Sequence, residues 1–83
     1  MIQSFRDKRV RAFAPFARPA QKRLRVLDAA EEIGDLMVLP SNRLEALHGG
    51  RKGQFSIRVD ARWRIRFGFH EGDAFDVEIT DEP

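Results

Sequence analysis

The second half of the chain holds three segments in which apolar and polar residues alternate. Their apolar members are Phe55, Ile57 and Val59; Trp63, Ile65, Phe67 and Phe69; and Phe75, Val77 and Ile79. Such alternation is typical of β-strands that bury one face. The spacing therefore predicts three strands in an antiparallel meander, whose apolar face other elements must cover.

The first half of the chain carries helical signals after a short alternating start at residues 1–5, which can form a strand. Ser4 and Asp7 are spaced as in a weak capping box, which predicts a helix that Pro15 ends. Pro19 suits the first turn of a second helix, running to about Ile33 and stopped by Gly34. Its apolar stripe is formed by Leu24, Leu27, Ala30 and Ile33. The segment 36–53 is interpreted as a connection.

These elements predict an α+β domain, with two N-terminal helices packed on an antiparallel sheet of three to four strands. Residues directly opposite each other on paired strands lie on the same face of the sheet. This rule places Val59 opposite Trp63 and Arg58 opposite Arg64, with residues 60–62 as the connection. In the next hairpin, a two-residue loop at Glu71–Gly72 would place Phe67 opposite Asp76 and mix the two faces. We therefore expect a bulged or longer loop near residues 70–73, with Gly72 at positive φ.

The composition narrows the class of protein. The 83 residues form one expected domain, 1–83, and they include no cysteine and only two histidines, so neither a disulfide framework nor a metal site is expected. No cofactor motif is present. No stretch is long or apolar enough for a membrane span or a signal peptide, which predicts a cytoplasmic protein.

The net charge of +2 hides alternating bands of charge. Residues 1–26 and 50–70 are basic, whereas residues 27–49 and 71–83 are acidic. Twelve of the fifteen basic residues are arginine, whose planar guanidinium suits phosphate. Paired surface charges would explain the bands equally well at this stage.

The opposed arginines are the most informative candidate site. Like charges directly opposite on neighbouring strands are unfavourable, and a sheet tolerates them more readily when an anion sits between them. Arg66 shares the face of Arg58 and Arg64, while Arg51 and Lys52 approach from a glycine-rich loop. This set suits a phosphate and its transition state. The alternative for Arg66 is a salt bridge with an acid of the next strand, Asp76 or Glu78.

Candidates for acid–base chemistry are fewer. His48 has the side chain that titrates nearest neutral pH, and Glu45 is a possible base. Either can instead be an ordinary loop or surface residue. Lys8 and Arg9 belong to a basic N-terminal segment that suits an RNA backbone, or that forms a solvated helix face.

The run from Asn42 to Val59, NRLEALHGGRKGQFSIRV, followed by WRIRF at 63–67 and DVEI at 76–79, resembles the HigB-type killer proteins of the RelE/ParE toxin superfamily. The resemblance spans nearly the whole chain. It implies a RelE-like microbial RNase fold and a metal-independent, ribosome-dependent mRNA endoribonuclease that inhibits translation. Its implied partners are the ribosome, mRNA and a helix-turn-helix antitoxin that carries it to operator DNA.

The resemblance also carries over residue by residue. Arg64 matches the strand arginine of the family, and Arg51 and Arg58 match other recurrent basic positions. The sequence departs from the pattern at His48, where relatives often have Lys, and at Glu45, where some have a catalytic His. Relatives commonly end Asp-Tyr-His. Here Asp81 matches, but Glu82 and Pro83 follow it. The alternative function is therefore a non-catalytic toxin of the same fold, either a ParE-like gyrase poison or a degenerate antitoxin-binding module.

Overall fold

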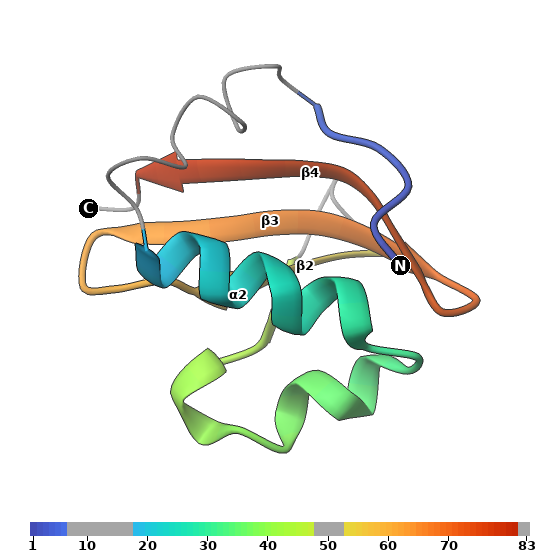
Figure 1. The fold of residues 1–83 in the computed structure, drawn as a ribbon, viewed down its shortest axis with the longest axis horizontal. Coiled ribbons are helices and arrows are strands. Elements are labelled where there is room, and N and C mark those ends of the chain that lie inside the picture. Colours follow the sequence, from blue (N-terminus) through green and yellow to red (C-terminus); the bar gives the residue numbers. More distant parts are fainter. Residues whose placement is uncertain (7–17, 48–52, 82–83) are drawn as a thin grey trace.

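The computed structural model describes residues 1–6, 18–47 and 53–81, and these form one sheet with a helix across it (Figure 1). The elements in chain order are α2 (Arg18–Ala29), the 3-10 turns η2 (Ile33–Met37) and η3 (Pro40–Asn42), and the strands β1 (Glu45–Ala46), β2 (Gln54–Arg58), β3 (Trp63–His70) and β4 (Asp73–Asp81). All neighbouring strands are antiparallel, in the order β1-β2-β3-β4. The α+β class with an antiparallel sheet is confirmed.

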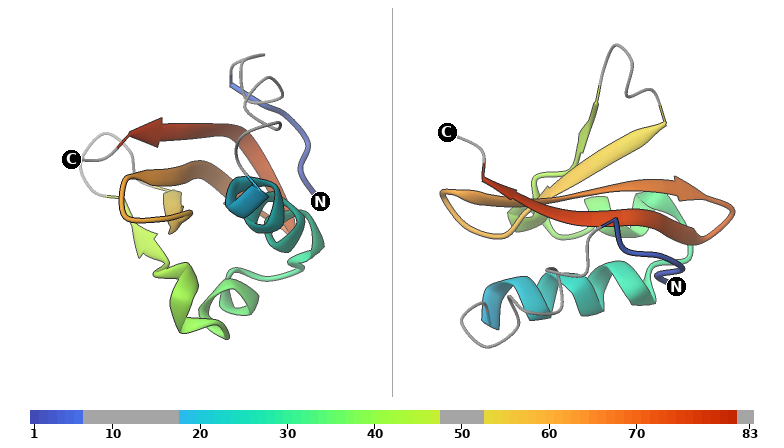
Figure 2. Two further views of the ribbon diagram at one scale, coloured as in Figure 1. Left: turned by 60° about the vertical axis from the view of Figure 1, so that its left-hand side comes forward. Right: turned by 90° about the horizontal axis from the view of Figure 1, so that it is seen from above.

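Figure 2 shows α2 lying across one face of the sheet. The hydrophobic core lies between that helix and this face. Leu27 from α2 and Leu36 from η2 are fully buried against Ile57, Ile65 and Phe67 of the two central strands. Each fully buried side chain of this size contributes roughly 1.5–3 kcal/mol relative to exposure. The predicted alternation of β2 and β3 therefore identifies the core face correctly. By the same alternation, Ser56, Arg58 and Arg64 lie on the opposite face.

The helices differ from the prediction. The second predicted helix is α2, but it ends at Ala29 instead of about Ile33. The carboxylate of Asp35 accepts hydrogen bonds from the backbone N–H groups of Glu31 and Glu32, at 2.9 and 3.1 Å, and this bonding opens the separate turn η2. The first predicted helix falls on residues 7–17, outside the described part, so two N-terminal helices are not confirmed: the described residues contain one α-helix.

The predicted connection 36–53 contains more structure than expected. η3 and the two-residue strand β1 lie within it, and β1 pairs with β2 at Glu45–Ser56 and Ala46–Phe55. This edge supplies the fourth strand. At the other edge, residues 1–6 run parallel to β4 through bridges at Ile2–Ala74 and Phe5–Val77. A two-residue strand is too short to produce a readable alternation, which explains why β1 was missed.

The β2–β3 hairpin has the predicted register. Phe55 lies opposite Phe67, Ile57 opposite Ile65, and Arg58 opposite Arg64. The backbone N–H of Val59 donates to the carbonyl of Trp63 at 2.9 Å, which closes the hairpin as expected. Apolar parity was sufficient here because no residue is inserted in either strand.

The β3–β4 hairpin corrects the sequence interpretation. The loop is the simple two-residue turn, with Glu71 and Gly72 both at positive φ (48° and 83°), and His70 pairs with Asp73. The expected irregularity is a bulge inside β4, where Asp76 has φ 52° and the register shifts between Arg66 and Gly68. The Ser4 hydroxyl accepts a hydrogen bond from the Asp76 N–H at 2.9 Å. Phe75 is therefore 38% exposed, and Ala74 takes its place in the core.

Candidate active site

The polar face of the sheet gathers charged side chains in two rows set by strand register. Arg58 and Arg64 lie opposite each other, with Thr80 next to Arg64 across β4. The second row runs from Glu45 on β1 through Ser56 on β2 and Arg66 on β3 to Glu78 on β4. The polar residues that the sequence analysis placed on one face therefore lie in cross-strand rows that extend over four strands.

Arg64 is the most firmly held side chain of this face. Its side chain is only 14% exposed. Nε donates to the hydroxyl of Ser56 at 3.0 Å, and Nη2 donates to the carbonyl oxygen of Arg43 at 2.8 Å and to that of Ser56 at 3.4 Å. Among the described residues, Nη1 has no acceptor. The guanidinium is thus fixed along one edge, and it keeps N–H groups for an anion.

Ser56 and Arg43 were not identified from the sequence as site residues. Ser56 is almost completely buried, and both its hydroxyl and its carbonyl accept from Arg64. The available signal was a small serine between Phe55 and Ile57, at a position of the polar face. Arg43 gave none, because its contribution is a backbone carbonyl at the end of η3, where its φ of 44° is left-handed.

Asn42 connects this carbonyl to the helical layer. Its side chain is fully buried, its amide donates to the carbonyl of Leu36 at 3.0 Å, and its oxygen accepts from Nη1 of Arg23 in α2. These bonds set the position of η3, and therefore the direction of the Arg43 carbonyl. Arg23 of α2 is thus linked to the Arg64 guanidinium through the Asn42 side chain and the backbone of Arg43.

Arg58 is held by its own hairpin turn. Its Nε donates to the carbonyl oxygen of Asp60 at 3.0 Å, and its two Nη groups have no acceptor among the described residues. Asp60 organises the same turn, because its carboxylate accepts from the backbone N–H groups of Arg62 and Trp63 at 2.8 and 2.9 Å. These hydrogen bonds, aided by the nearby arginines, hold the pKa of the Asp60 carboxyl below its ordinary value. The Arg62 guanidinium lies over the Trp63 ring, 5.2 Å from its centroid.

A cleft of about 360 Å³ lies between these groups. It is lined by four arginines, two carboxylates and one small residue: Arg43, Arg58, Arg62, Arg64, Glu45, Asp60 and Ala61. Cations outnumber anions by two to one in the lining. A positive cleft with pre-positioned guanidinium donors suits a phosphodiester and the extra charge of its pentacoordinate transition state.

Glu45 is the carboxylate best placed to act on a bound substrate. Its side chain is 63% exposed, and Oε2 lies 3.9 Å from Nη2 of Arg64. This distance is a loose ion pair, so the carboxylate keeps its acceptor capacity for a proton or a hydroxyl group. The structure therefore brings together Arg58, Arg64 and Glu45 from the predicted set.

The other candidates have different outcomes. Arg66 on β3 and Glu78 on β4 are cross-strand partners, so both lie on the same face of the sheet. The Glu78 carboxylate is also 3.4 Å from Nε of Arg6. Asp81 lies at the end of β4, where its backbone pairs with Trp63. The remaining predicted residues lie outside the described part: His48, Arg51, Lys52, Lys8 and Arg9.

Within residues 1–6, 18–47 and 53–81, no group of three or more His, Cys, Asp or Glu side chains is arranged to hold a metal ion. No helix in the same ranges is long and apolar enough to cross a membrane.

Comparisons with known proteins agree with the fold. The family described as the RelE-like toxin of type II toxin-antitoxin system HigB matches residues 3–81. Endoribonuclease HigB of Proteus vulgaris is 37% identical over 91 residues, covering 98% of each chain. Toxin HigB-1 of Vibrio cholerae serotype O1 is 42% identical over 58 residues, which cover 70% of this chain and 61% of that protein.

The crystal structure of YafQ from E. coli strain BL21(DE3) superposes with a TM-score of 0.57 at 11% identity, over 99% of this chain and 92% of YafQ. At that identity the likeness shows the fold alone, and it confirms the RelE-like fold expected from the sequence. The family match carries the assignment: the chain belongs to the HigB family of RelE-like toxins of type II toxin-antitoxin systems.

Proposed function

We propose that this toxin is an endoribonuclease that cleaves messenger RNA without a metal ion, in the cleft between β1, β2 and β3. The observation that carries the proposal is the pair Arg58 and Arg64. They lie directly opposite each other, are held by different backbone carbonyls, and both keep donors for an anion. The relative from Proteus vulgaris, which matches over 98% of its length, is named an endoribonuclease.

The chemistry that fits this cleft uses the RNA's own 2′-hydroxyl as nucleophile. A base removes the hydroxyl proton, the 2′-oxygen bonds to the adjacent phosphorus, and the bond from phosphorus to the 5′-oxygen breaks. The products are a 2′,3′-cyclic phosphate and a 5′-hydroxyl that has received a proton. Positioning and electrostatic stabilisation carry such a reaction, because no metal is required to generate the nucleophile.

The candidate residues have different roles in this scheme. Arg64 and Arg58 bind the non-bridging phosphate oxygens and stabilise the charge that develops on them. Glu45 accepts the 2′-hydroxyl proton, since its exposed carboxylate lies beside Arg64 at the open side of the cleft. We assign the acid that protonates the leaving 5′-oxygen to His48, with Asp81 near the end of β4 as an auxiliary group. Arg51, Lys52, Arg66, Lys8 and Arg9 would contact the RNA backbone.

We also propose that cleavage takes place on the ribosome in the cytoplasm, and that the antitoxin is a helix-turn-helix protein that connects the toxin to operator DNA. The cleft supports the first point, because it presents guanidinium donors for phosphate but few groups that read a base. The ribosome, which holds the message in a defined position, would align the scissile phosphodiester with the cleft.

The decisive experiment is primer extension on a translated reporter message, with and without purified ribosomes. The wild-type toxin should cut within the reading frame only when ribosomes are present. Arg64→Ala should reduce cleavage by about 10²–10³-fold, the usual cost of removing a transition-state donor. Arg25→Ala, which removes an exposed arginine of α2, is the charge-matched control and should cleave normally.

Growth arrest with intact messages would overturn the nuclease assignment and favour a toxin that acts by binding. Equal cleavage of free and ribosome-bound message would overturn the ribosome dependence alone.

A further inference from the structure

A second hollow, of about 450 Å³, lies at the far end of β3 from the arginine cleft. Its apolar floor includes Ile33, Phe55 and Phe69, which pack against the core but are only partly buried. Its rim carries three carboxylates, from Glu31, Glu32 and Glu71, and no Lys or Arg lines it among the residues that the structure describes. We call this region the acidic groove. Its volume lies within the range of about 300–1,000 Å³ typical of binding pockets.

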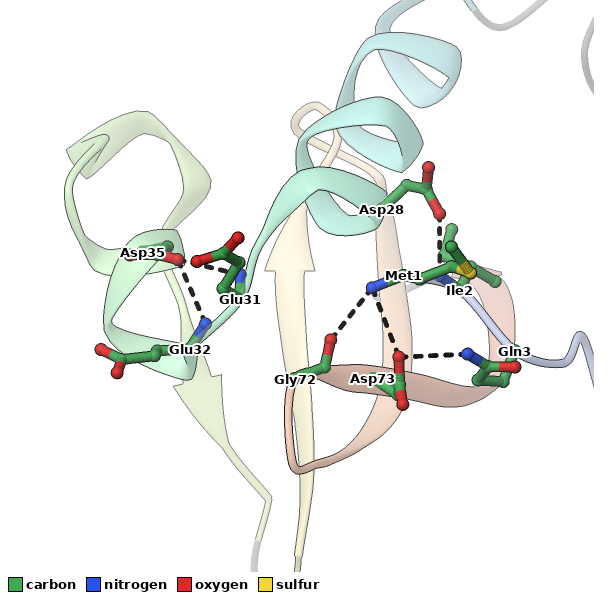
Figure 3. A network of polar contacts seen from close by, with 9 residues as sticks. All are labelled: Met1, Ile2, Gln3, Asp28, Glu31, Glu32, Asp35, Gly72 and Asp73. Atoms are coloured by element: carbon green, nitrogen blue, oxygen red, sulfur yellow. Dashed lines mark hydrogen bonds and ion pairs between the residues drawn. The ribbon is translucent and has the colours of Figure 1, made fainter.

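The walls of the groove are fixed in place. The turn of the β3–β4 hairpin approaches the end of the helical layer so closely that a Cβ at Gly72 would lie 3.0 Å from the carbonyl oxygen of Glu31. Figure 3 shows the supporting contacts, in which Asp35 holds the N–H groups of Glu31 and Glu32, and Asp28 accepts from the N–H of Ile2 at 2.8 Å. The groove is therefore a preformed surface, which lowers the ordering cost of binding.

Two carboxylates of the rim, those of Glu31 and Glu71, are available to a partner, whereas Glu32 takes part with Asp35 in the capping box of η2. The Glu31 and Glu32 residues are exposed, and the Glu31 carboxylate has no cationic partner among the described residues. Glu71 has a loose contact with His70, 3.8 Å from Nε2, on two well-exposed side chains. Negative charge around an apolar floor repels RNA, so the groove is unsuited to the substrate of the cleft.

We propose that the acidic groove is a docking site for the antitoxin, which inserts an apolar side chain between Phe55 and Phe69 and places Lys or Arg residues against the rim. The proposal rests on membership of a toxin-antitoxin family, which gives the chain an antitoxin partner, and it does not depend on RNA cleavage. An apolar anchor in a pocket supplies affinity, while complementary charge at its rim supplies specificity and a faster association rate.

The test measures, by calorimetry, the affinity of the purified toxin for its purified antitoxin. The double variant Glu31→Lys and Glu71→Lys should bind at least about tenfold more weakly, and its affinity should depend less on salt than that of the wild type. Arg64→Ala and Arg62→Glu, both in the cleft, should bind the antitoxin normally. Thermal unfolding of each variant checks that it is folded.

The contrary outcome is equally specific. Unchanged affinity in the rim variant would overturn the proposal, and lost affinity in the cleft variants would place the antitoxin on the arginines instead. Val38→Asp tests a third surface, because Val38 is 74% exposed within an apolar run at 37–39. A loss confined to that variant would also overturn the proposal. Slower amide exchange at residues 31–33 and 69–72 on complex formation gives a readout that needs no substitution.

Discussion

The arginine cleft and the acidic groove lie near opposite ends of β3 and use charge in opposite ways. Arg64 and Phe69, which represent the two sites, are separated by five residues, or roughly 17 Å of extended strand. In the cleft, long cationic side chains are held by buried or backbone acceptors. In the groove, carboxylates stand exposed around aromatic rings. If the two proposals hold, catalysis in the cleft uses charges fixed in direction, whereas recruitment of a partner at the groove needs only charges of the correct sign.

The largest effect should follow from changing the shape of a fixed charge without removing it. Arg64→Lys keeps the positive charge but cannot reach Ser56, Arg43 and a phosphate at the same time. We expect RNA cleavage to fall by about 100-fold, as for the loss of one transition-state donor, in single-turnover assays. Arg62→Lys, at the exposed rim of the same cleft, is the matched control. Similar losses in both variants would show that the direction of the Arg64 guanidinium is irrelevant.

Removing the support behind the cleft should cost stability as well as activity. Asn42→Ala deletes two hydrogen bonds of a fully buried amide, and it leaves the Leu36 carbonyl without that donor. We expect a loss of about 2–4 kcal/mol in the free energy of unfolding, measured by urea titration. Ser41→Ala removes only an exposed hydroxyl contact with Arg23, at 3.3 Å, and should be close to neutral. A neutral Asn42→Ala would contradict the proposed path from α2 to Arg64.

A smaller effect on cleavage alone should come from Ser56. Ser56→Ala removes the acceptor of Arg64 Nε but keeps the backbone carbonyl and the strand packing. We expect about tenfold slower cleavage, corresponding to one hydrogen bond of about 1.4 kcal/mol. The substrate concentration at half-saturation should change little, since phosphate binding by Arg58 is retained. Ser56→Thr, which keeps the hydroxyl, should recover part of the rate, and a failure of both variants to slow cleavage would exclude a positioning role.

In the acidic groove, one substitution should raise the free energy of unfolding and at the same time weaken antitoxin binding. Glu71 has φ 48° at a turn position that favours Asn, so Glu71→Asn should raise the free energy of unfolding by about 0.5–1 kcal/mol. The same change removes one carboxylate from the rim, and it should weaken antitoxin binding by about two- to threefold. Urea titration and calorimetry on the same sample measure the two effects. A more stable variant with tighter binding would argue against the acidic rim as a recognition element.

The smallest effect should depend on pH. The backbone N–H groups of Arg62 and Trp63 lower the pKa of the Asp60 carboxyl, so this carboxylate stabilises the folded protein above its ordinary pKa. That stabilisation should disappear as the pH falls through the lowered pKa of the folded state. The difference in unfolding temperature between wild type and Asp60→Ala should therefore be present at neutral pH and absent in acid. A difference that persists in acid would mean that Asp60 acts through packing.

The comparison of the two β-hairpins explains which structural predictions succeeded. Apolar parity alone predicted that Arg58 faces Arg64, and the strands contain no inserted residue that could spoil it. In the second hairpin the same reasoning correctly indicated one extra residue but located it in the loop. The structure accommodates it at Asp76, where Ser4 from a distant segment accepts its N–H. A bulge held by residues more than seventy positions away leaves no local signal.

The residues of the candidate site also divide into those that the sequence revealed and those that it did not. Arg58, Arg64 and Glu45 were recognisable because guanidinium and carboxylate groups are the expected chemistry for a phosphodiester. Ser56 and Arg43 were not, because they act as acceptors that direct Arg64, one of them through its backbone. The acidic groove was also not predictable, since its members come from three separate parts of the chain.

The sequence by itself determined the α+β class, the core face of β2 and β3, and the opposition of two arginines, because period-two alternation depends only on neighbouring residues. It also carried a pattern that places the chain among HigB-type toxins. Only the tertiary structure decided where α2 ends, where β4 bulges and which groups orient Arg64. Those outcomes depend on which distant groups form hydrogen bonds with backbone N–H and C=O groups, and only the folded chain brings these groups together.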